Sequence, residues 1–335
     1  MRNSQDVVSP GIWRLAGMRL LADTSARVAL ALLSLIVLAC LSAPLYANYI
    51  AHTDPFRSNI SGEVTIAGQS FAVIEASTEG LGLGQTPIGP TGHPEAYLLG
   101  ADNQGRDVAA RLLYGGRASL LIAGAATLIC LFLGALLGIV AGYFGGVVDI
   151  VLSRLLDVLW AFPVYLLAIS LSIVTIGTGL HIGPFNIESD SLLLPSLIIG
   201  LVYLPYVARP VRAHALTLRH SDFVQAAIGL GVPTPRILRV DVLPNVMTTL
   251  IVFMPLMMAL NMLTESALSF LSIGVQPPNA SWGSIIQDGL SLLYTRPVVA
   301  LAPGIAIVIT VVALNLFGDA LRDALDPRTT LKFKA

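Results

Sequence analysis

Lysine is nearly absent from this sequence of 335 residues, and its two lysines, Lys332 and Lys334, fall within the last four positions. A P-loop ATPase needs a lysine in its glycine-rich loop, and a Schiff-base enzyme needs one in its pocket, so both classes are excluded. Charged residues of either sign are also scarce, at 12% of the chain against about 25% in soluble proteins. With a formal net charge of -1, the sequence predicts no basic surface for nucleic acid.

Motifs for catalysis and for metal binding are missing as well. Neither His-Glu-x-x-His nor Gly-x-Ser-x-Gly occurs, and the five histidines are scattered, so the sequence predicts no catalytic residue and no metal site. Cys40 and Cys130 both lie in apolar stretches, where they are expected to pack as small hydrophobic residues rather than form a disulfide framework. The chain is therefore not expected to be an enzyme, which leaves transport or a scaffold role.

Hydrophobic residues make up 55% of the chain and gather in long intervals without Asp, Glu, Lys or Arg. About 20 apolar helical residues cross a membrane core of ~30 Å. Backbone groups inside a bilayer must be hydrogen-bonded within the protein, so each interval predicts a helix. One further interval, 266–287, is interrupted by glycine and proline and is interpreted as a helix end plus a loop. The sequence predicts an all-α polytopic membrane protein with six transmembrane helices at about 26–47, 118–143, 155–177, 192–211, 246–273 and 298–318.

Lysine and arginine predict the orientation of these helices. With the N-terminus inside, the inner segments contain 14 basic residues and the outer segments contain 5. Both the N-terminal segment 1–25 and the tail 321–335 are therefore expected in the cytoplasm. The first span, 26–47, is longer than the apolar part of a signal peptide and is expected to remain as an anchor.

The outer loop, 48–117, is the largest segment expected outside the membrane. Apolar and polar residues alternate from Glu63 to Glu75, on either side of a turn at Gly68, which predicts a β-hairpin. The glycine- and proline-rich run from Gly80 to Gly92 is interpreted as a linker.

The loop between the fourth and fifth spans, within 212–245, is predicted to form two short helices. Asp222 followed three residues later by Gln225 is similar to a capping box, and Gly231 can supply a left-handed turn that ends the first helix. Thr234 is expected to cap a second helix, which Pro244 would end. The small side chains of Ala226 and Ala227 would let another protein's backbone approach closely. The simpler alternative is an ordinary amphipathic connector.

This loop resembles the EAA loop of ABC importer permeases, which in that family is the coupling region that contacts the ATPase subunit. The resemblance rests on Gln225-Ala226-Ala227, Gly231 and Leu243-Pro244. Four other blocks are similar to the C-type permease of dipeptide, oligopeptide and nickel importers, in family order across roughly 99–328. They are Leu99 to Asp107 with Arg111, Gly115 and Arg117; Gly142 to Gly146 with Asp149, Arg154, Asp157 and Phe162-Pro163; Leu268 to Pro278 with Ser281-Trp282-Gly283; and Gly318-Asp319 through Arg328.

The resemblance implies the ABC importer type I permease fold, with 118–320 as a five-helix core. It also implies a prokaryotic inner membrane, a second homologous permease, two cytoplasmic ATPase domains that bind ATP and Mg, and an external binding protein. The coupling residues would be Asp222, Phe223, Gln225, Ala226, Ala227 and Gly231. The chain departs from the family at Gln225, which stands where glutamate is usual, and at Asp241, where a basic or aromatic residue is commoner. The stretch 60–98 matches no part of the family pattern.

Several residues inside the predicted spans are open to two interpretations. Met254, Met258, Asn261 and Glu265 share a helix face and form either a pathway wall or a hydrogen-bonded packing cluster. Arg154 and Asp157 form either a structural ion pair or a gate contact. The glycines at 134, 138 and 142 predict close helix packing, within the subunit or against the partner permease. The prolines at 163, 205, 255 and 303 predict bends, either static or used in gating.

The sequence therefore predicts the permease subunit of an ATP-driven importer, with di- and oligopeptides as the expected cargo. Nickel chelates, glutathione and oligosaccharides stay open as alternatives. A secondary transporter would need more intramembrane ionisable residues than Glu265 provides. A scaffold subunit that transports nothing is the third class.

Overall fold

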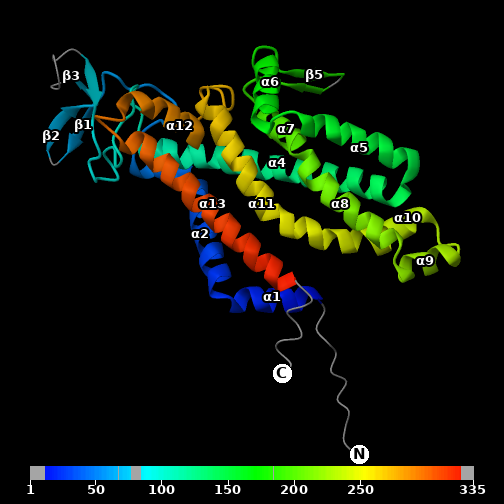
Figure 1. Ribbon diagram of the computed structural model, residues 1–335. Coiled ribbons are helices and arrows are strands. Elements are labelled where there is room, and N and C mark those ends of the chain that lie inside the picture. Colours follow the sequence, from blue (N-terminus) through cyan, green and yellow to red (C-terminus); the bar gives the residue numbers. More distant parts are fainter. Residues whose placement is uncertain (1–11, 67, 77–83, 184, 326–335) are drawn as a thin grey trace, which may run out of the picture.

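The computed structural model describes residues 12–66, 68–76, 84–183 and 185–325, and this part of the chain is mainly helical. Strands β1, β2 and β3 lie at one end of the molecule, and helices α9 and α10 lie at the opposite end (Figure 1). The long helices α4 and α11 run between the two ends, whereas α13 runs from the first end to α1. The expected fold class, an all-α body with a small outer region between the first two spans, agrees with this arrangement.

The N-terminal part begins with a helix that the sequence analysis did not predict. Helix α1 (Ile12–Ala22) lies beside the last turn of α13, where Arg19 Nη1 donates a hydrogen bond of 3.4 Å to the carbonyl of Ala324. Asp23 separates α1 from α2 (Thr24–Leu41) because its carboxylate accepts the first backbone N–H groups of α2. The chain then continues through α3 (Ala43–Leu45) and a π-helical turn, Tyr46–Ile50.

The segment that the sequence predicts outside the membrane, called the outer region, contains two antiparallel hairpins. The end of the molecule that carries it is called the outer end, and the end that carries α9 is called the inner end. Strand β1 (Glu63–Ile66) pairs with β2 (Gln69–Ala72), which confirms the predicted hairpin. Strand β3 (Ile74–Ala76) pairs with β4 (Gln85–Pro87). The interpretation of 80–92 as a linker is therefore wrong for β4, whose residues are held by a strand partner, and residues 80–83 lie outside the described part.

Helix α4 (Val108–Phe144) is the longest helix among the described residues and begins ten positions earlier than the second predicted span. Its glycine ridge packs against α8 (Leu204–Arg219). A Cβ on Gly138 would lie 2.6 Å from the carbonyl oxygen of Ala208, and one on Gly142 would lie 2.4 Å from that of Arg212. The ridge thus serves packing within the subunit, the first of the two alternatives.

The third predicted span is not a single helix. It consists of α5 (Gly146–Ala161) and α6 (Val164–Ile176), which meet at an angle of 88° at Phe162–Pro163. Proline lacks the N–H that would continue the helix, and it holds the preceding residue in an extended conformation. A small hairpin, β5 (Leu180–Ile182) and β6 (Phe185–Ile187), follows and was not predicted.

The other span prolines act differently from one another. Helix α7 (Leu193–Val202) meets α8 at 47°, two residues before Pro205. By contrast, Pro255 and Pro303 lie inside helices that continue through them. The expectation of a bend is therefore confirmed at Pro163 and near Pro205, while Pro255 and Pro303 do not break their helices.

The second half of the chain completes the helical body. The prediction that Pro244 ends a short helix is wrong, because α10, a π-helical turn and α11 continue into one another from Thr234 to Phe270. Helix α12, which begins inside the interval 266–287 that was interpreted as a helix end plus a loop, was also missed. The bounds are α9 (Asp222–Gly229), α10 (Thr234–Ile237), the π turn (Leu238–Val242), α11 (Leu243–Phe270), α12 (Trp282–Gly289), a 3₁₀ turn (Leu290–Leu292) and α13 (Val298–Leu325).

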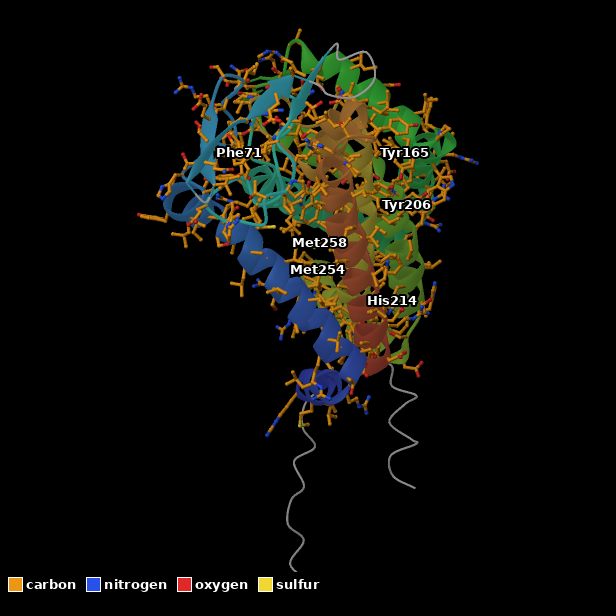
Figure 2. The ribbon with its side chains drawn as sticks, turned by 90° about the vertical axis from the view of Figure 1, so that its left-hand side faces the viewer. Phe71, Tyr165, Tyr206, His214, Met254 and Met258 are labelled. Carbon is orange, nitrogen blue, oxygen red and sulfur yellow. The ribbon has the colours of Figure 1, made fainter. Side chains whose placement is uncertain are left out.

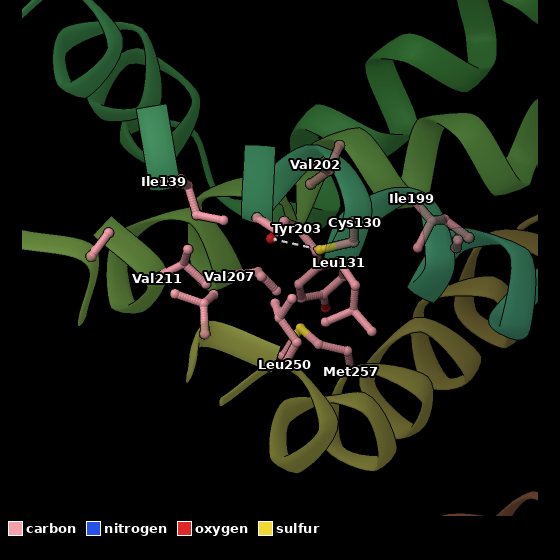
Figure 3. Close-up of a cluster of buried hydrophobic side chains, with 14 of the residues drawn as sticks. Cys130, Leu131, Ile139, Ile199, Val202, Tyr203, Val207, Val211, Leu250 and Met257 are labelled. Carbon is pink, nitrogen blue, oxygen red and sulfur yellow. Dashed lines mark hydrogen bonds between the residues drawn. The ribbon is translucent and has the colours of Figure 1, made fainter. Parts of the chain in front are cut away.

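Four helices in the described residues are long and apolar enough to cross a membrane, and there are up to six spans if each bent pair counts as one. The main core lies between α4, α7, α8 and α11, where buried side chains such as Leu131, Val207 and Met257 pack together (Figure 3). Cys130 belongs to this core, and its thiol donates a hydrogen bond of 3.3 Å to the carbonyl of Tyr203. Cys40 and Cys130 are both buried and free, as the sequence predicted.

Candidate functional site: the α9 segment and the polar groups behind it

Helix α9 begins one residue after Ser221, which occupies the N-cap position without a side-chain capping bond. The capping box expected between Asp222 and Gln225 does not form. Instead, Gln225 Nε2 donates a hydrogen bond of 2.7 Å to the carbonyl of Arg219. Gln225 therefore ties α9 back to the end of α8. Thr234 is likewise the first residue of α10 rather than its cap.

Helix α9 has one buried side chain, and most of its other side chains are exposed. Val224 is fully buried, whereas Phe223 is 48% and Ile228 is 45% exposed. Leu230, which follows the helix, is 84% exposed. Ala226 is exposed and Ala227 is half-buried. Such a concentration of exposed apolar side chains on a short protruding helix is typical of a surface that another protein covers.

The turn after α9 has the geometry that glycine favours. Gly231 has a φ of +75°, and the N–H of Val232 donates to the carbonyl of Ala227 across it at 3.0 Å. This pattern closes the helix by satisfying its free carbonyl groups. The prediction of a left-handed turn at Gly231 is confirmed.

Val224 connects α9 to the main core. It belongs to the same buried cluster as Leu218 of α8, Ile237 of α10 and Val242 of the π turn. Because α10 continues into α11, this cluster joins α9 to both α8 and α11.

An ion pair at the same end joins α5 to α8. Arg212 contacts Asp149 through both its Nε and its Nη2, the latter at 2.6 Å. The pair thus ties the first turn of α5 to α8.

Within α11, Asn261 and Glu265 are fully buried. Asn261 Nδ2 donates to Thr127 of α4 at 2.9 Å, and Ser269 donates to Glu265 Oε1 at 2.8 Å. Further hydrogen bonds to Glu265 come from Ser119 and Ser281, which lie on α4 and at the start of α12. In this conformation both residues occupy a hydrogen-bonded packing cluster, the second of the two alternatives in the sequence analysis.

The methionines predicted with them lie differently. Met254 is 45% exposed, whereas Met258 packs partly against the cluster around Cys40 and Trp282. Figure 2 shows both in the middle of the helical body. Met254 is thus the member of this set that presents the most surface to another molecule.

A second polar cluster, at the outer end, was not predicted as a unit. Asp102 and Asp288 each accept contacts from both Arg106 and Arg111, and the Arg111 side chain is only 4% exposed. Asp288 of α12 lies 182 positions from Arg106, so sequence spacing carried no signal for this contact. At the start of α4, burial raises the pKa of Asp107, which caps the helix by accepting from the N–H of Ala110.

Metal binding has no support in the described part of the chain. No group of three or more His, Cys, Asp or Glu side chains lies close enough there to hold an ion. The polar clusters consist instead of arginine–carboxylate pairs and serine–carboxylate hydrogen bonds, which hold helices together.

The comparison with family models decides what kind of protein this is. A model described as "Binding-protein-dependent transport system inner membrane component" matches residues 134–331, more than half of the chain. The chain belongs to this family. The permease is therefore a multi-pass inner membrane component of a transport system and not a catalytic subunit, as the sequence analysis expected.

Relatives of this permease support the assignment. A provisionally named peptide transport system permease of Brucella abortus biovar 1 is 42% identical over 70% of this chain and 75% of its own length. The oligopeptide transport system permease protein OppC of Bacillus subtilis is 32% identical over 96% of this chain and 91% of its own. The glutathione transport system permease protein GsiD of Pectobacterium atrosepticum is 35% identical, with coverage of 71% and 74%.

Among solved structures, the permease is similar in fold to a chain of the inward-facing MetNI methionine ABC transporter. The TM-score is 0.50 at 16% identity, over 64% of this chain and 96% of that one. At this identity the likeness concerns the fold alone, and it confirms the predicted ABC permease fold.

Proposed function

We propose that this chain is one of two permease subunits of an ATP-driven peptide importer, and that α9 is the surface on which an ATPase subunit acts. Peptide permeases among the relatives support the cargo class. In this assignment two partner ATPase domains bind ATP and Mg, and an external binding protein delivers the cargo. Both termini lie in the cytoplasm, because α1 and the end of α13 are expected on the same side of the membrane as α9.

One observation carries the coupling role. Phe223 and Ile228 of α9 and Leu230 just after it are exposed, while Val224 anchors the helix in the main core. A surface helix without such an anchor would move independently of the membrane spans. With the anchor, closure of the ATPases can displace α8 and α11 together.

The energy for this displacement must come from a difference between two states. A ligand that binds two conformations equally well shifts neither, so the ATPase must contact α9 better in one state than in the other. Asp222, Gln225 and Ala226 are also exposed, next to these apolar side chains, and would form part of the contact with the ATPase.

The cargo pathway is proposed along the exposed side of α11 that carries Met254. Methionine is flexible and polarizable, which suits a surface that varied peptides must pass. Met258, Asn261 and Glu265 would support this wall from behind, since Asn261 and Glu265 are buried. Glutathione is the second candidate cargo, favoured by the 35% identity to a glutathione permease.

A substitution at Ala226 tests the coupling role. We expect Ala226→Trp, in the complete transporter in proteoliposomes, to abolish peptide uptake and cargo-stimulated ATP hydrolysis, because the ring would hold the ATPase away from α9. Membrane insertion should persist, since Ala226 is exposed. Ala227 is a poorer position because it is half-buried.

Ala22→Trp, at an exposed position at the end of α1, is the matched control and should leave uptake near the wild-type level. Normal uptake by the Ala226→Trp transporter would count against the coupling role of α9. A wild-type complex that carries no peptide at all would instead refute the cargo assignment.

A further inference from the structure

A cavity of about 440 Å³ opens at the outer end of the molecule and is called the outer cavity. It lies between the segment 104–111 at the start of α4, the segment 269–279 at the end of α11, and α12. Figure 1 shows α12 at the end that carries strands β1 to β3. Of these segments only 269–273 overlaps a predicted membrane span, so the cavity is expected to open outside the bilayer. Its volume is in the range of cavities that hold ligands.

Charged side chains form one wall of the outer cavity. Arg111 lines this wall, and its Nη1 contacts both Asp102 and Asp288. Its Nε, however, is buried and has no acceptor in the described part of the chain. Asp288 Oδ2 accepts contacts from Arg106 and Arg111, while Oδ1 receives no hydrogen bond from the described residues. The wall therefore has an unpaired donor and an unpaired acceptor, and such groups gain free energy when a ligand supplies their partners.

Carboxamide side chains add further unpaired groups. Gln104, Asn279 and Gln287 line the outer cavity, and their side chains form no hydrogen bond with other described residues. Each carboxamide has two donor hydrogens and one acceptor oxygen. By contrast, Gln276 Nε2 is already engaged, because it donates to the carbonyls of Ser272 at 3.3 Å and Gly274 at 3.1 Å. The three free carboxamides suit a ligand that carries donors and acceptors together, as a polypeptide backbone does.

The charge balance of the outer cavity favours an uncharged ligand. Arg106 and Arg111 are matched by Asp288 on the same wall and by Asp102 behind it, so the four charges cancel. A lipid phosphate would meet the Asp288 carboxylate, and a cation would meet the two arginines. Peptide groups carry no charge and supply one N–H and one carbonyl each. The cavity therefore fits a polypeptide segment better than it fits an ion or a headgroup.

The floor of the outer cavity is fixed before any ligand arrives. Ser269 lines the cavity, and its hydroxyl donates to Glu265 Oε1 at 2.8 Å. The same hydroxyl accepts from the N–H of Val275 at 3.0 Å, which ties the segment after α11 to this buried cluster. A ligand that binds a preformed site does not have to order it, so less of its binding free energy is lost.

We propose that a loop of the external binding protein inserts into the outer cavity. This inference rests on the proposed import, in which a binding protein delivers the cargo from outside, and on a family that is described as binding-protein-dependent. Carbonyl groups of the loop accept hydrogen bonds from Arg111 and from the carboxamide of Gln287. An N–H of the loop donates to Asp288 Oδ1. The cavity thus holds the binding protein by its backbone at one fixed place on the permease.

The test measures the Kd of the purified, peptide-loaded binding protein for the complete transporter in lipid nanodiscs. Gln287→Trp would fill the cavity with an indole ring, and the variant should fold because Gln287 is exposed. It should raise the Kd about tenfold, the scale of a residue at the centre of an interface. Gln69→Trp, the same substitution at an exposed position of β2 outside the cavity, is the matched control and should leave the Kd unchanged.

Cross-linking identifies the occupant. Cys40 and Cys130 are buried, so a photoactivatable label on Gln287→Cys marks the cavity alone and should join the binding protein, whereas the label on Gln69→Cys should not. Equal weakening by both tryptophan variants, or a label at 287 that joins only lipid, would overturn the proposal. Free peptide that protects Gln287→Cys from thiol reagents without any binding protein would assign the cavity to cargo and overturn it too. If the wild-type transporter neither binds a binding protein nor imports peptide, the proposed function itself fails.

Discussion

The two ends of this molecule use charge in opposite ways. At the outer end, Asp102, Arg111 and Glu265 are almost completely buried and are held by partners from α4, α11 and α12. At the inner end, Arg154 and Asp157 are among the exposed side chains, and their ion pairs lie at the surface. Buried charges tolerate little displacement, whereas exposed ones can exchange partners at small cost.

This difference indicates a division of labour along the permease. The outer end, where the loop 102–106, the start of α4 and α12 are bound together, is expected to move as one block. The inner end, with α9, presents the surface that an ATPase subunit would contact. The α4–α8 seam, with its three close-packed glycines, connects the two.

The largest effect is expected from breaking the outer cluster. Arg111→Ala should lower the free energy of unfolding by about 3–5 kcal/mol, because it leaves Asp102 buried without its full set of partners. Thermal unfolding of the purified subunit measures this. Arg57→Ala, at an exposed position in the same outer region, should change the melting temperature little. Equal melting temperatures for the two variants would show that the outer end is not held by these charges.

Two glycine-to-alanine substitutions on α4, one inside the α4–α8 seam and one outside it, should change the free energy of unfolding in different directions. Gly138→Ala should destabilise by about 1–3 kcal/mol, since the added Cβ would overlap the backbone of α8. Gly124→Ala has open space around its Cβ and should be neutral or stabilising by up to ~1 kcal/mol, the helix preference of alanine over glycine. Unfolding measurements on both variants decide the matter. Destabilisation by both would contradict the role given to the ridge.

The smallest effect is expected at the inner end, where the Arg212–Asp149 pair is partly exposed. Asp149→Asn should cost at most about 1 kcal/mol, because solvent screens the pair with Arg212. Thermal unfolding of the wild type and of Asp149→Asn measures this difference. A loss of several kcal/mol would contradict the small contribution assigned to the pair.

The sequence predicted the spans well because long intervals without charge have one structural solution in a bilayer. It predicted α9 and its turn at Gly231 because a left-handed turn favours a specific residue. Prolines were less informative. Pro163 bends the chain by 88° while Pro255 and Pro303 do not break their helices, and the local sequence does not distinguish these outcomes.

Sequence reasoning failed where partners lie far apart along the chain. Asp288 and Arg106 are neighbours in space but 182 positions apart, and Glu265 meets serines from two other helices. Sequence reasoning was also incomplete at α9. Phe223 was among the predicted coupling residues, whereas Ile228 and Leu230 became candidates only when the structure showed their exposure.

Cross-linking at Leu230 tests the coupling role of α9 most directly. Cys40 and Cys130 are both buried, so Leu230→Cys introduces a selectively reactive thiol at an 84% exposed position. In the complete transporter, this thiol should cross-link to an engineered cysteine on an ATPase subunit, with a yield that changes when nucleotide binds. A thiol that reacts only with reagents added outside the membrane, or that never joins an ATPase subunit, would contradict the proposed role of α9.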